Sequence, residues 1–201
     1  MSKTLLVPGL NGSGEGHWQR FWAADHDDAV LLEQDRWEYP VLRDWLSRLE
    51  DALLATSGAY LVGHSLGSVL IAHLADRPAA RLVKGALLVA PCDVGLTGVL
   101  HPGLLRFGEM PQKPLPFPAL VVGSRNDPYM PLDGLRRHAS AWQADIVDLG
   151  EAGHINIASG FGRWTGGYDL LSLLRARRRP RKGGKGNPAQ AAAETTERPV
   201  P

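Results

Sequence analysis

Short apolar runs alternate along the chain with longer segments that place apolar residues at helical spacing. Apolar runs bounded by Gly or Pro are typical of strands that are buried on both faces. The pattern predicts strands over residues 4–7, 29–32, 59–62, 85–90, 119–122 and 145–149. Most of these runs are apolar throughout rather than alternating, which indicates that helices cover both faces of the sheet.

The segments between the strands predict the helices. Residues 41–54 place apolar side chains on one face and charged ones on the other, and Pro40 stands where a helix tolerates it. Further helices are predicted over residues 66–75, 132–142 and 163–178. This alternation predicts an α/β fold, a doubly wound parallel sheet of about six strands with its functional residues at the carboxyl ends of the strands.

Residues 92–118 are the least regular segment of the chain. They are rich in Gly and Pro but also carry large apolar residues. An irregular apolar segment of this length is typical of a lid over a site. A crossover that contains a short helix is an equally good interpretation, and the sequence leaves both open.

Composition adds an uneven distribution of charge. The 201-residue chain has 22 Lys and Arg, 21 Asp and Glu, and one Cys. Residues 175–201 hold eight of the basic and two of the acidic residues, so residues 1–174 carry a net charge of −5. We therefore predict one domain over 1–174 and a basic tail over 175–201, which has too few large apolar residues to fold. A single Cys excludes a disulfide framework and a thiolate-rich zinc site within one chain.

The charge pattern and the apolar runs limit the partners. A basic tail can bind nucleic acid or an anionic surface, but we expect a solvated extension and no nucleic-acid partner for the domain. The apolar run at residues 5–7 is too short for a signal-peptide core. The longest uncharged run, 59–75, is shorter than the roughly 20 apolar residues of a membrane span. We expect a cytoplasmic protein without a membrane partner, and its oligomeric state stays open.

The strongest chemical signal is Gly63-His64-Ser65-Leu66-Gly67, which follows a predicted strand and opens a predicted helix. In this G-x-S-x-G context the serine occupies a strained turn, and the flanking glycines let neighbouring backbone approach. Its hydroxyl then projects at the helix N-terminus, where free N–H groups favour a developing oxyanion. The sequence therefore predicts Ser65 as a nucleophile.

A serine nucleophile needs a histidine base. His73 lies inside the helix that follows Ser65, and His101 lies in the irregular segment. His138 stands on a predicted helix beside two arginines, where we expect a surface position. His154 follows the last strand at the functional edge of the sheet, so we predict it as the base.

The base needs an acid to orient it, expected between the serine and the histidine in the chain. Asp127 follows the strand at 119–122, and Pro128 fixes the backbone after it. Asp93 follows the preceding strand and is the reserve candidate. We predict Asp127 as the acid.

The loop after the first strand, residues 8–14, is expected to complete the site. An oxyanion hole needs two N–H donors, which we assign to the backbone of Leu66 and Leu10, with Asn11 as the next choice. The loop is Gly-rich but lacks the ending of a phosphate-binding loop, so no nucleotide is expected. Asn11, His17 and Trp18 are possible substrate-pocket residues, although packing is the commoner role of a Trp.

Four segments, VPGLNGSGEGHW, LVGHSLGS, GSRNDPYMP and EAGHINIASGFGRW, resemble the compact α/β-hydrolase family of the retinoblastoma-binding-protein-type serine hydrolases. The resemblance covers residues 3–174. It implies a short α/β-hydrolase fold without a large cap domain, and it matches Ser65, Asp127 and His154 to the nucleophile, acid and base. Pro8-Gly9 stands where many hydrolases have His-Gly. The chain has no Leu-x-Cys-x-Glu motif, so a pocket-protein partner is not implied.

These residues predict a serine hydrolase that acts on small ester, thioester or amide substrates, its partner being a small-molecule acyl substrate. No metal or cofactor is required. The alternative is a non-catalytic binding protein on a hydrolase scaffold, whose basic tail engages nucleic acid or anionic surfaces.

Overall fold

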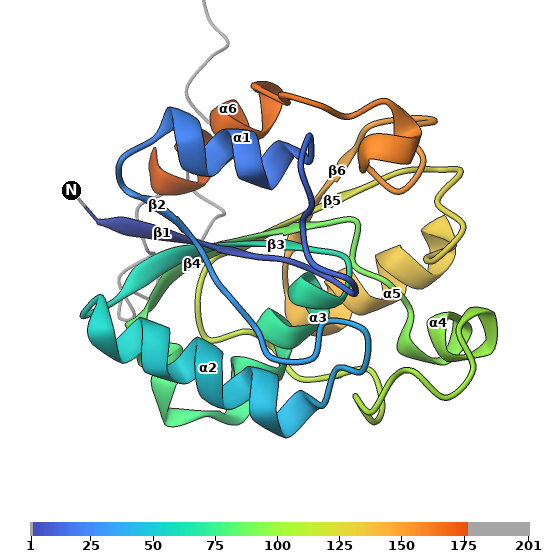
Figure 1. Ribbon diagram of the computed structural model, residues 1–201, viewed down its shortest axis with the longest axis horizontal. Coiled ribbons are helices and arrows are strands. Elements are labelled where there is room, and N and C mark those ends of the chain that lie inside the picture. Colours follow the sequence, from blue (N-terminus) through green and yellow to red (C-terminus); the bar gives the residue numbers. More distant parts are fainter. Residues whose placement is uncertain (1, 177–201) are drawn as a thin grey trace, which may run out of the picture.

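The computed structural model describes residues 2–176, and a parallel sheet forms their centre (Figure 1). Its strands are β1 (Lys3–Val7), β2 (Ala29–Leu31), β3 (Ala59–His64), β4 (Val83–Val89), β5 (Ala119–Gly123) and β6 (Asp145–Asp148). Their order is β2-β1-β3-β4-β5-β6, and all neighbours run parallel. The predicted α/β fold is confirmed, and each predicted strand is present to within two residues at each end.

Helices cover both faces of this sheet. They are α1 (Trp18–Asp25), α2 (Leu42–Ala55), α3 (Leu66–Ala72), α4 (Val94–Leu100), α5 (Leu132–Trp142) and α6 (Gly166–Ala176), with short 3₁₀ turns at His73–Asp76, Pro78–Leu82 and Ile157–Ser159. Figure 1 shows α1 and α6 on one face and α2, α3 and α5 on the other. The sequence pattern predicts four of these helices but misses α1 and leaves α4 open.

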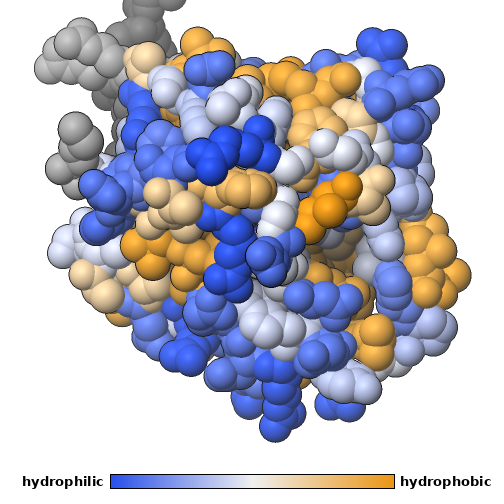
Figure 2. Space-filling view, turned by 45° about the horizontal axis from the view of Figure 1, so that its top comes forward, coloured by the Kyte–Doolittle hydropathy of each residue, from blue (hydrophilic) through white to orange (hydrophobic). Residues whose placement is uncertain are grey.

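Alternate residues of the four central strands, β1, β3, β4 and β5, supply two hydrophobic cores. Leu5 and Val7 of β1 belong to the core under α2, α3 and α5, whereas Leu6 belongs to the core under α1 and α6. Fully burying one such side chain contributes about 1.5–3 kcal/mol. Most residues of these strands are buried, and the face drawn in Figure 2 carries hydrophobic residues in patches among hydrophilic ones.

The irregular segment 92–118 contains the short helix α4 and then a stretch of turns and bends. Phe107, Leu115 and Phe117 of this stretch are buried in the core beside α2 and α5. The crossover with a short helix, one of the two open interpretations, describes what the structure shows.

The last helix passes the predicted end of the domain. Arg175 donates to Thr4 Oγ1 at 2.6 Å and to Asp28 Oδ2 at 2.9 Å, so this residue of the predicted tail packs against the start of the sheet. The remainder of the tail, 177–201, lies outside the described residues. Across residues 2–176, every helix is too short or too polar to cross a membrane.

Candidate active site

Ser65 occupies the sharp turn that joins β3 to α3. Its backbone angles, φ 52° and ψ −121°, lie in a region that residues other than Gly rarely adopt. The flanking glycines make room for this turn. A Cβ at Gly63 would lie 2.7 Å from the Ser68 backbone nitrogen, and one at Gly67 would overlap the Val7 carbonyl oxygen. The turn therefore needs glycine at both positions, as the motif predicts.

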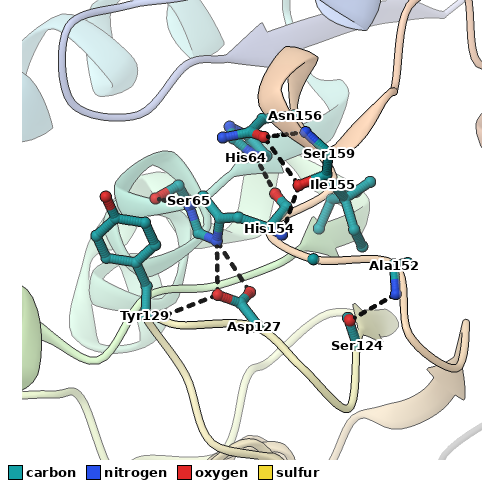
Figure 3. A network of polar contacts seen from close by, with 12 residues as sticks. His64, Ser65, Ser124, Asp127, Tyr129, Ala152, His154, Ile155, Asn156 and Ser159 are labelled. Carbon is teal, nitrogen blue, oxygen red and sulfur yellow. Dashed lines mark hydrogen bonds and ion pairs between the residues drawn. The ribbon is translucent and has the colours of Figure 1, made fainter.

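Three side chains from three loops meet in one chain of hydrogen bonds (Figure 3). His154 Nε2 lies 2.8 Å from Ser65 Oγ, and His154 Nδ1 lies 2.9 Å from both Asp127 carboxylate oxygens. Because a carboxylate only accepts, Nδ1 carries the proton and Nε2 is free to accept from the serine hydroxyl. The Tyr129 N–H donates to Asp127 Oδ1 at 2.8 Å and fixes the carboxylate. The structure thus brings together the three residues selected from the sequence.

The reserve acid has another task. Asp93 Oδ1 accepts the Leu96 N–H at 2.8 Å and so forms the N-cap of α4. This contact occupies the carboxylate at a helix N-terminus, and Asp127 is the acid that contacts the histidine.

Two other histidines make contacts that the sequence did not indicate. His138 is buried rather than at the surface, because its ring stacks on Trp142 with the centroids 5.8 Å apart, and the prediction of a surface position is wrong. His101 stacks on Tyr129, whose ring centroid lies 4.5 Å from that of His154. Tyr129 therefore stands beside the candidate base with His101 packed against it, and sequence spacing gave no sign of this.

Two backbone N–H groups are available as oxyanion donors. Gly9 lies directly against the turn, since a Cβ there would be 2.9 Å from Ser65 Cβ and 3.2 Å from the Leu66 nitrogen. Among the described residues, the N–H groups of Leu10 and Leu66 have no backbone acceptor, whereas the Asn11 N–H donates to the Trp37 carbonyl at 3.1 Å. The Asn11 N–H is therefore already bonded, and the assignment of Leu10 and Leu66 as the oxyanion donors stays a prediction.

The three possible pocket residues differ in exposure. Asn11 is exposed, whereas His17 and Trp18 are 5% and 1% exposed. His17 Nδ1 accepts the Gln19 N–H and forms the N-cap of α1. Burial, helped by the nearby His154, lowers the His17 pKa to about 4, so its ring is neutral at pH 7. His17 and Trp18 thus lie beneath the loops of the site.

A buried thiol adjoins the nucleophile. Cys92 is 1% exposed, and its thiol lies close to Ser65. Burial raises the Cys92 pKa to about 11, so the thiol stays protonated and is a poor nucleophile. Within residues 2–176, no three His, Cys, Asp or Glu side chains group as metal ligands would.

A parallel sheet covered by helices, with a serine on a tight strand-to-helix turn and a histidine after the last strand, defines the α/β-hydrolase class. Within this class, the chain belongs to the serine hydrolase family, whose family model matches residues 4–173. The enzyme is accordingly a hydrolase.

Solved structures agree with this assignment. A putative YdeN-like hydrolase from Pectobacterium atrosepticum is 32% identical, with a TM-score of 0.75 over 86% of this chain and 90% of that one. The ydeN gene product of Bacillus subtilis is 21% identical, with a TM-score of 0.69 over 88% of this chain and 100% of that one. A putative dienelactone hydrolase from Klebsiella pneumoniae, 15% identical, shares the fold with a TM-score of 0.64 over 88% of each chain. No curated protein matches the chain.

Proposed function

We propose that this protein is a serine hydrolase that cleaves small esters, thioesters or amides through a covalent acyl-enzyme, with Ser65, His154 and Asp127 as nucleophile, base and acid. The observation that carries the proposal is the continuous hydrogen-bond chain from Ser65 Oγ through both ring nitrogens of His154 to the Asp127 carboxylate. Such a chain is how proteins activate a serine hydroxyl, which is unreactive at its ordinary pKa.

The acylation step follows from this geometry. Ser65 Oγ attacks the carbonyl carbon while its proton passes to His154 Nε2, and Asp127 stabilises the resulting imidazolium. The N–H groups of Leu10 and Leu66 donate to the oxyanion of the tetrahedral intermediate. When the intermediate collapses, the leaving group takes the proton from His154 and the acyl group stays on Ser65.

Deacylation repeats these roles with water. His154 takes a proton from a water molecule, whose oxygen attacks the acyl carbon, and returns that proton to Ser65 Oγ as the acid product leaves. The steps use side chains, backbone N–H groups and water.

Small or exposed acyl groups are the proposed substrates, because residues 2–176 include no large cap domain over the sheet edge. We also propose that the chain belongs to the retinoblastoma-binding-protein-type subfamily, on the four segments that resemble it. A cytoplasmic location and a solvated tail without a nucleic-acid partner stay predictions.

Labelling with a fluorophosphonate probe tests the proposal. Wild-type protein should be labelled and Ser65→Ala should not. Ser68→Ala is the matched control, because it also removes a serine hydroxyl, but three residues further along the chain. Ser68 Oγ donates to the Val89 carbonyl at 3.1 Å and not to the histidine. Labelling that persists in Ser65→Ala, or that is absent from wild type, would reject the mechanism. Turnover of acetyl, butyryl and octanoyl esters, with the matching thioesters and amides, would then rank the substrate classes.

A further inference from the structure

Side chains from other parts of the chain hold the backbone of the loop that carries His154 (Figure 3). The Ala152 N–H donates to Ser124 Oγ at 2.9 Å, and the Gly153 N–H donates to Asn126 Oδ1 at 2.7 Å. The His154 N–H donates to Ser159 Oγ at 3.0 Å. Three consecutive N–H groups are thus fixed without any regular secondary structure.

Two consecutive carbonyl groups of the same loop are fixed by buried aromatic donors. His64 Nε2 lies 3.0 Å from the His154 carbonyl oxygen. Trp18 Nε1 donates to the Ile155 carbonyl oxygen at 2.8 Å. His64 is the residue before the nucleophile, and Trp18 is the first residue of α1. The loop of the base is therefore attached to the turn of the nucleophile.

Ile155 shows why such an attachment is needed. Its φ of 49° lies in the left-handed region, which a β-branched residue almost never enters, and its side chain is fully buried. Strain of this kind persists only where surrounding contacts impose it. His64 and Trp18 supply such contacts. They bond the carbonyl oxygens of His154 and Ile155, which lie on either side of the strained φ and ψ angles of Ile155.

The protonation state of His64 suits this role. Burial lowers its pKa well below the ordinary value, so its ring is neutral and carries a single N–H. A carbonyl oxygen only accepts, so that N–H is on Nε2. The ring of His17 also packs against His64, with its centroid 4.9 Å from that of His64.

We propose that His64 and Trp18 are positioning residues, which set His154 Nε2 against Ser65 Oγ by holding the two carbonyl groups that flank the strained Ile155. This inference rests on the proposed function. Both residues bond the backbone of the base, and the His64 ring also lies beside the His154 ring, with the centroids 5.0 Å apart. A displacement of His154 by about 1 Å suffices to slow an acyl transfer about 100-fold.

Two substitutions of His64 separate positioning from packing. The amide nitrogen of Gln is as many bonds from Cβ as His Nε2, and that of Asn is one bond shorter. His64→Gln should therefore keep kcat within about threefold of wild type, whereas His64→Asn should lower kcat at least about tenfold, with KM changed less than about twofold. Equal kcat values for the two variants would overturn the proposal. This holds if both values stay at the wild-type level, and also if both fall together with the melting temperature.

Trp18→Phe tests the second donor, and Trp142→Phe is its matched control. Trp142 is also buried, and its Nε1 donates to the Pro111 carbonyl at 2.9 Å, remote from the His154 loop. Both variants should lose similar thermal stability, but only Trp18→Phe should lose kcat and fluorophosphonate reactivity. Equal reactivity of the two variants would overturn the role of Trp18. An unlabelled wild-type protein would instead reject the proposed function, so the two failures are distinguishable.

Discussion

Replacing Gly67 with Ala should disrupt the nucleophile turn more than any other single methyl group would. The new Cβ would overlap the Val7 carbonyl oxygen, and the Pro8 carbonyl oxygen would also be too close. These are backbone atoms at the end of β1, so no side-chain rotation relieves the overlap and β1 or α3 must shift. Overpacking of this kind costs about 3 kcal/mol. For a domain of this size, that corresponds to a fall in melting temperature of roughly 6–12 °C.

Thermal unfolding followed by circular dichroism measures this effect, with Gly98→Ala as the control. Gly98 lies in the helix α4, and a Cβ there meets open space. Gly98→Ala should therefore stabilise the protein by about 0.5–1 kcal/mol, because Ala loses less backbone entropy on folding than Gly. If Gly67→Ala melts within about 1 °C of wild type and still labels with fluorophosphonate, the proposed steric need for glycine beside the nucleophile is refuted.

Three other substitutions or treatments follow from the site. Asp127→Asn should lower kcat by about 10⁴-fold, because the histidine then loses the carboxylate that fixes its tautomer. Asp93→Asn should stay active, since Asn is also a good N-cap. The reverse result would make Asp93 the acid instead of Asp127. His17 has a pKa of about 4 in the folded protein, so below about pH 6.5 the unfolded chain binds this proton more readily than the folded one. The free energy of unfolding should therefore fall by about 3 kcal/mol between pH 6.5 and 4. His17→Asn keeps the N-cap but does not titrate, so the melting temperature of this variant should fall less over this pH range than that of the wild type. If both proteins lose the same amount, the lowered pKa of His17 is contradicted. The Cys92 thiol should resist iodoacetamide at pH 8 in the native protein and react in denaturant, as mass spectrometry would show; rapid native modification would disprove its burial.

The strands and the site residues were predictable because both depend on local patterns. Apolar runs identify buried strands, and the residue after each strand identifies the functional edge. Ser65, Asp127 and His154 were selected in this way, and the structure joins them through hydrogen bonds. Their catalytic roles stay predictions until they are measured.

What the sequence did not show depends on contacts between distant residues. His64 contacts a carbonyl 90 positions away, which no spacing rule indicates. The helix α1 was missed because it has only eight residues and an uncommon His N-cap. His138 was misplaced because its two arginine neighbours outweighed a better signal, the apolar face formed by Leu135, Ala139 and Trp142 at helical spacing.

The bond from Arg175 to Thr4 has a consequence for engineering. It places the two ends of the described chain side by side, so a short linker from Ala176 to Ser2 could join them. New ends could then open between Gly108 and Glu109, both exposed. In such a circular permutant the acid and the base would precede the serine, so the nucleophile moves from first to last in chain order while the three positions in space stay unchanged.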